Sequence, residues 1–189
     1  MANRNTVGFG LIAQGVVGST MASQGQGKYF IDSNHGAAMF QGTVVQSKAG
    51  YIVTSEDGRT KLTIGILNGI FYNDGTTLKP TFSNHYVANT VPANSEDITA
   101  FVIDNPTQQY VCATDAAVTQ AGFLETYDMN ASAGSTTTGK STSTLNIGVT
   151  GADSKSLRLL RVAEDPENDD IGSTLCSVVV CLNLIELQS

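Results

Sequence analysis

The sequence predicts a mainly β protein, a β-sandwich or barrel of about ten short strands with an extended N-terminal arm. Apolar and polar residues alternate along much of the chain, helical periodicity is scarce, and Gly-rich turns separate the apolar runs. Only 14% of the 189 residues are charged, well below the roughly 25% of a typical globular domain. The length suffices to bury a hydrophobic core without disulfides or a structural metal.

The first 27 residues are predicted to form the extended arm. Residues 7–27 contain six glycines among small and polar residues, and the apolar side chains between them are dispersed. Such a segment buries little apolar surface by itself, so we expect it to lie along a neighbouring subunit, the alternative being a floppy terminus. The candidate partner-binding residues are Phe9, Leu11, Ile12, Val16 and Val17.

Residues 28–189 are predicted to form a β-rich body, with a C-terminal subdomain from about 129 as an alternative division. Its strands are separated by turns such as Glu56-Asp57-Gly58, and Asn73-Asp74-Gly75 carries a hairpin signal. The predicted strands are residues 29–31, 38–45, 51–53, 61–67, 70–72, 77–78, 99–103, 109–113, 144–150, 156–162 and 173–187.

Three segments of this body carry more detailed signals. The alternation in residues 157–162 slips phase at Leu159 and Leu160, as it does at a β-bulge. Residues 177–186 are apolar on both faces, which predicts a central strand or one that is covered by another subunit. Residues 115–125 are predicted to form one short helix.

Charge and cysteine content exclude several classes of function. The net charge is −7 and the ten basic residues are scattered, so we expect no nucleic acid partner. No stretch resembles a signal peptide or a membrane span, which predicts synthesis in a cytoplasm and no membrane partner. Cys112, Cys176 and Cys181 lack the spacing of a disulfide framework or a zinc site and are predicted to be packed thiols.

Residues 134–141 satisfy the phosphate-binding pattern G-x-x-x-x-G-K-[ST], in which Lys140 and Ser141 would serve phosphate and magnesium. A functional loop of this kind follows a buried strand and opens a helix, whose amides complete the anion site. Here residues 128–133 form a weak strand signal and residues 142–147 alternate as β. The sequence therefore favours an exposed loop over a nucleotide site.

No other motif predicts chemistry. The acidic run 164–170 lacks the ligand spacing and central Gly of an EF-hand, which favours a solvated turn over a calcium site. His35 and His85 have no neighbouring Ser, Cys or carboxylate pattern that marks a triad or a metal site. We therefore predict no catalytic residue, no cofactor and no metal ligand, and expect a protein that is not an enzyme.

The order of segments resembles that of the small capsid decoration, or cement, proteins of tailed bacteriophages, and the resemblance spans nearly the whole chain. The matching pieces are an N-terminal Gly-Phe arm, a Tyr-x-Ile strand, short apolar strands with Gly, a Thr-Gly-Lys-Ser loop and a final apolar strand with Asn. They are Gly8-Phe9-Gly10, Tyr29-Phe30-Ile31, residues 39–42, residues 65–72, residues 102–106, Thr138-Gly139-Lys140-Ser141, Leu157-Arg158-Leu159 and Cys181-Leu182-Asn183.

This resemblance implies a virion structural protein on the capsid exterior. It would bind the major capsid protein, associate with itself, commonly as a homotrimer with a dimer as the alternative, and reinforce contacts between capsid subunits. The resemblance gives the Thr-Gly-Lys-Ser loop no nucleotide role. Two alternatives stay open: another virion module, such as a tail tube, fibre or receptor-binding β-domain, and an enzyme that uses the loop at 134–141.

Overall fold

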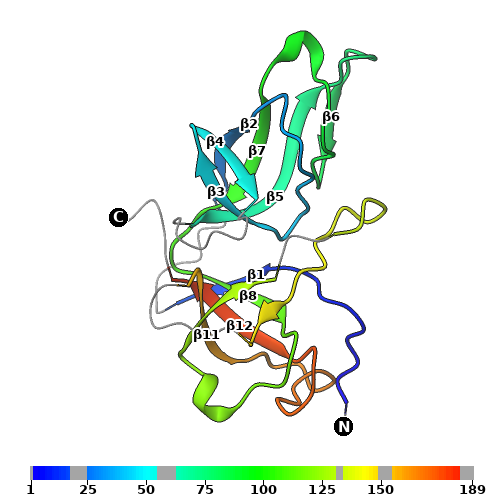
Figure 1. The fold of residues 1–189 in the computed structure, drawn as a ribbon. Helices are drawn as coiled ribbons and strands as arrows, with labels where there is room; N and C mark the ends of the chain where they lie inside the picture. Colours follow the sequence, from blue (N-terminus) through cyan, green and yellow to red (C-terminus); the bar gives the residue numbers. More distant parts are fainter. Residues whose placement is uncertain (1, 18–24, 55–62, 131–133, 149–154, 184–189) are drawn as a thin grey trace.

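The computed structural model describes residues 2–17, 25–54, 63–130, 134–148 and 155–183. They form two antiparallel six-stranded sheets, one above the other in Figure 1. This confirms the predicted fold class, a mainly β protein of the sandwich type, although the described residues contain twelve strands where about ten were expected. The predicted turn at 56–58 lies outside the described residues, as do the far ends of the strands predicted at 144–150 and 173–187.

The sheet built around β8, here called the β8 sheet, takes strands from both ends of the chain. In spatial order it contains β1 (Ile12–Val16), β8 (Gln108–Ala113), β12 (Ser177–Leu182), β11 (Leu157–Val162), β9 (Thr126–Met129) and β10 (Leu145–Asn146). As predicted, β12 is central: it pairs with β8 and β11, and five of its six side chains are buried. The register of β11 shifts between Leu159 and Arg161, which confirms the predicted bulge.

The second sheet, here called the β5 sheet, is formed by the middle of the chain. Its order is β2 (Gly27–Ile31), β7 (Ile98–Ile103), β5 (Thr63–Asn73), β3 (Val44–Lys48) and β4 (Tyr51–Thr54), and β6 (Pro80–Ser83) pairs with β5. The single strand β5 replaces the two predicted at 61–67 and 70–72, because a bulge between Leu67 and Gly69 lets the chain continue. The predicted hairpin exists, but its loop extends to Lys79.

Each sheet has its own hydrophobic core, and the two cores meet. The β5 sheet buries Met39, Ile52, Leu67 and Ile98 among others. The core of the β8 sheet includes Tyr110, Leu157, Leu159 and Val180, and it also takes in Val44 and Ile66 from the other sheet. The sheets are therefore joined by apolar packing as well as by the chain.

The helix predicted at 115–125 is wrong. Only a three-residue 3₁₀ turn, Gln120–Gly122, forms there, because long-range hydrogen bonds use the polar groups of the segment. The amide of Asp115 donates to the Leu145 carbonyl (3.0 Å), and its carboxylate accepts from the Ile147 amide (2.9 Å). The amide of Val118 donates to the Ile171 carbonyl (2.8 Å), so tertiary pairing replaces the helical pattern.

The N-terminal segment differs from the predicted arm. Its described part, residues 2–17, lies against the body of its own chain, and β1 pairs with β8. Leu11 is buried in the core of the β8 sheet. The amide of Asn5 donates to Oδ1 of Asn168 (2.7 Å) and its side-chain amide to the Leu175 carbonyl (3.0 Å). The β5 sheet takes all its strands from residues 27–103, and the β8 sheet takes its strands from the segments on both sides of that range.

We predict that Leu159→Ala lowers the free energy of unfolding by about 2–5 kcal/mol, because a fully buried side chain would leave a cavity between β9, β11 and β12. Urea unfolding followed by fluorescence or circular dichroism measures the change. Val91→Ala, at a side chain that is 71% exposed, is the control and should change the value by less than about 0.5 kcal/mol. Equal losses in the two variants would contradict this assignment of the core.

We also predict that stability falls as pH rises from about 9 to 11. Burial raises the pKa of the Cys176 thiol to about 11, with help from the charges of Asp169 and Asp170, and burial raises the pKa of Cys112 as well. The unfolded chain loses these protons first, so it binds fewer protons than the folded chain and unfolding becomes easier with rising pH. Urea unfolding at several pH values would measure the fall, which Cys176→Ala should reduce.

Candidate partner-binding site

The first candidate surface is the outer edge of β1. The strand lies at the end of the β8 sheet and pairs only with β8, in the register Ile12 to Val111 and Val16 to Gln108. Within the described residues no strand pairs with its other side. An edge strand presents a row of unpaired backbone N–H and C=O groups, which can accept a further strand. Figure 1 shows β1 beside β8, on the side of the β8 sheet that faces the β5 sheet.

Backbone contacts on both sides hold this strand in place. Before it, the Leu11 amide donates to the Gly42 carbonyl (2.9 Å) and the Gly10 amide to the Ser143 carbonyl (3.0 Å). Gly10 has φ +69°, and a Cβ there would come within 2.6 Å of the Ser141 Cβ, so this crossing requires glycine. After the strand, the Val17 amide donates to the Thr107 carbonyl (2.7 Å).

The five candidate partner-binding residues of this segment differ in how far their side chains are exposed to solvent. Ile12 is 52% exposed and Val17 is 42% exposed, so both are accessible to a partner. Phe9 and Val16 are half-buried. Leu11 is 3% exposed and belongs to the core, so it is not a partner-binding residue in the folded chain. Strand alternation does not separate Leu11 from Ile12, because Leu11 precedes β1 and the first three residues of β1 are all exposed.

A groove runs beside β1 at the junction of the sheets. One hollow of about 280 Å³ is lined by Phe9, Ile12, Ile66, Ile103 and Lys140 among others. A second hollow of about 210 Å³ shares Ala13, Asn68 and Ile103 with the first and continues to Gln14, Gln26 and Gln108. The sequence could not reveal this junction groove, because its walls come from segments far apart in the chain.

The loop at 134–141 does not have the geometry of a phosphate site. The amide of Ser135 donates to the Lys140 carbonyl (3.0 Å), that of Gly139 to the Ser135 carbonyl (2.7 Å) and that of Ser141 to the Gln41 carbonyl (2.9 Å). These three amides are therefore occupied by the chain itself. The described residues after the loop, 142–148, contain β10 and no helix. The loop instead joins the sheets, since Lys140 also forms a parallel bridge with Gln41.

The acidic run 164–170 anchors the N-terminus. The amide of Asp170 donates to Oδ1 of Asn3 (3.0 Å), and Arg4 forms an exposed ion pair with Glu167. Hydrogen bonds from the Ser173 hydroxyl and the Gly172 amide lower the pKa of the Asp170 carboxyl. In the part of the chain that the structure describes, no three His, Cys, Asp or Glu residues are grouped as a metal site.

The two histidines lie in packed surroundings near β6. The His35 ring lies 5.8 Å from the Tyr86 ring, and the His85 ring stacks on Phe40 at 5.9 Å. Nδ1 of His85 is 3.3 Å from the Ser83 hydroxyl, but that hydroxyl donates to the His85 carbonyl (2.8 Å). Nδ1 also faces the Asn84 side-chain oxygen at 3.1 Å, which calls for a proton on Nδ1. The pair therefore lacks the arrangement in which His would deprotonate Ser.

Comparison of the chain with protein-family models, curated proteins and solved structures found no match.

Among the described residues, Cys112 and Cys176 are buried free thiols and Cys181 is a half-buried one. The described helices are two three-residue turns, too short to cross a membrane.

We expect magnesium-ATP to leave the melting temperature of the protein unchanged to within about 1 °C, because the loop amides are already paired. Lys140→Ala should behave identically with and without the nucleotide. Differential scanning fluorimetry with a concentration series of nucleotide measures both. A rise in melting temperature for the natural chain that Lys140→Ala removes would restore the nucleotide-site hypothesis.

Proposed function

We propose that this protein decorates the exterior of a tailed-phage capsid and stabilises it by binding the major capsid protein, without catalysing a reaction. The observation that carries the proposal is the outer edge of β1, with which no other strand of the described residues pairs, together with the apolar junction groove beside it. The resemblance of the segment order to cement proteins supports the same function. Self-association, as a homotrimer or a dimer, belongs to this proposal.

An extended segment of a capsid subunit would bind by adding a strand to β1. Backbone hydrogen bonds to the strand edge supply affinity, and alternate side chains enter pockets beside the edge. Here the apolar walls near Phe9, Ile66 and Ile103 would receive those side chains. Several such weak contacts per capsid subunit add up through avidity, which is how a cement protein resists the outward pressure of packed DNA.

The charge of the chain agrees with a position on the exterior. A net charge of −7 repels a phosphate backbone, so the protein would not compete with capsid proteins for the genome. Attachment would then depend on apolar and backbone contacts rather than on long-range attraction.

Removal of residues 7–27 is a poor test, since it also removes Leu11 from the core and β1 from the sheet. A substitution at an exposed position is sharper. We predict that Ile12→Asp weakens attachment to expanded capsids that lack the protein by on the order of tenfold or more, because a carboxylate would enter the apolar groove. Co-sedimentation over a concentration series measures the attachment.

Val87→Asp is the matched control, because Val87 is 50% exposed, similar to Ile12, and lines neither part of the junction groove. It should attach as well as the natural chain, and both variants should keep its circular dichroism spectrum. Attachment that is unaffected by Ile12→Asp would exclude the β1 edge as the capsid-binding surface. Failure of the natural chain to bind any capsid would exclude the decoration function itself.

A further inference from the structure

The outer face of the β5 sheet carries phenylalanine side chains from four strands. Phe30 of β2 is 51% exposed and Phe82 of β6 is 75% exposed, although large aromatic residues are usually buried. Phe71 pairs across the strands with Phe82, and their ring centroids are 4.6 Å apart. Phe101 of β7 lies on the same face. Exposed aromatic clusters of this kind mark binding sites.

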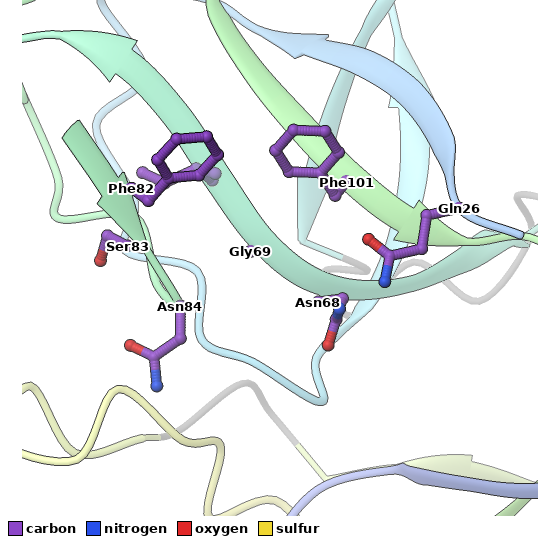
Figure 2. Close-up of a pocket in the computed structure, with 8 residues that line it drawn as sticks. Gln26, Asn68, Gly69, Phe82, Ser83, Asn84 and Phe101 are labelled. Carbon is purple, nitrogen blue, oxygen red and sulfur yellow. The ribbon is translucent and has the colours of Figure 1, made fainter. Parts of the chain in front are cut away.

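Two of these rings, Phe82 and Phe101, line an open groove of about 400 Å³, here called the aromatic groove. Figure 2 shows Phe82 and Phe101 lying side by side over the sheet, with Gly69 between the strands that carry them. The ring centroids are 6.4 Å apart and the ring planes are within 14° of each other. The absence of a side chain at Gly69, the register partner of Phe101, leaves the space beside the rings open.

The polar groups of the groove are amides and a hydroxyl, and none of its eight lining residues is charged. Oδ1 of Asn68 accepts from the Gln41 side chain (2.9 Å), which leaves its NH₂ group to donate to a ligand. The Gln26 amide makes no hydrogen bond to another described residue, and Figure 2 places it beside Phe101, on the same side as Asn68. Both amides are thus available at one end of the ring platform.

We propose that this groove binds a neutral oligosaccharide. The C–H groups on one face of a pyranose ring carry partial positive charge and pack on the negative faces of Phe82 and Phe101. The sugar hydroxyls, which both donate and accept, pair with the amides of Gln26 and Asn68. A flat, open groove suits a β-linked chain of gluco-configured sugars, whose equatorial hydroxyls point sideways to the amides.

Other ligand classes fit the lining less well. A phosphate, sulfate or uronic acid group would find no cation among the lining residues, since Lys28, in register with Phe101 on the neighbouring strand, is not one of them. A purely apolar ligand would leave the amides of Gln26 and Asn68 without partners. A protein partner remains as an outcome of the test below.

The test titrates the full chain with cellohexaose, maltohexaose and chitohexaose, followed by isothermal calorimetry and saturation-transfer NMR. At least one of these neutral hexamers should bind at millimolar concentration, with cellohexaose or chitohexaose preferred. Phe82→Ala should weaken that binding by on the order of tenfold or more, because half of the ring platform is lost. The exposure of Phe82 means that the substitution leaves the fold intact.

Phe30→Ala is the matched control: it removes an exposed ring from the same face, outside the groove, and should not change binding. Trigalacturonate, an acidic sugar, should bind more weakly than the neutral chains. The proposal is overturned if none of the three hexamers binds, or if Phe82→Ala and Phe30→Ala weaken binding equally. It is also overturned if Phe82→Ala abolishes capsid attachment in the absence of sugar binding, which would make the rings a protein-docking surface.

This inference is independent of capsid attachment, and the variants keep the two apart. Phe82 lines the aromatic groove and not the junction groove, whereas Ile12 lines the junction groove and not the aromatic one. Gln26 and Asn68 line both surfaces, so substitutions there are unsuitable as the decisive test.

Discussion

The arrangement of the two sheets depends on a crossing of three chain segments at Gly10, Gly42 and Ser141. The Leu11 amide donates to the Gly42 carbonyl, and the Gly42 amide donates to the Leu67 carbonyl, both at 2.9 Å. Gly42 has φ +88°, and a Cβ on Gly10 would come within 2.8 Å of the Gly42 carbonyl oxygen. Two glycines thus allow backbones from different sheets to approach closely, and hydrogen bonds then hold them at that distance.

This crossing is what places the candidate surfaces. It directs Leu11 into the core of the β8 sheet and leaves the next residue, Ile12, at the start of an edge strand. It also sets β1 beside Ile66 and Ile103, so that a groove forms where the sheets meet. The loop at 134–141 packs on the same junction through Gln41 and Asn84. These contacts account for the conformation of the loop without a phosphate ligand.

The sequence predicted those features that depend on local pattern. The alternation of apolar and polar residues predicted the fold class and the bulge near Leu159, and the apolar run of residues 177–186 predicted the central position of β12. These predictions succeeded because burial of one or both faces of a strand determines which of its positions are apolar. The prediction of a helix at 115–125 was wrong because backbone amides of this segment donate to the carbonyls of Leu145 and Ile171. No local pattern in the sequence indicates such long-range pairing. The sequence likewise could not show that β1 pairs with β8 of its own chain, because the two strands lie about a hundred residues apart.

The aromatic groove could not be predicted from the sequence because its two rings, Phe82 and Phe101, lie on separate strands, and only the strand order brings them together. Asn68-Gly69 is central to that order. In isolation this dipeptide favours a tight hairpin turn, yet here the strand continues through it as a bulge, since both flanks pair with β7. The bulge presents Asn68 to both grooves, and the missing side chain of Gly69 leaves the ring platform open. A single irregularity in β5 therefore makes the two grooves neighbours, with Asn68 lining both.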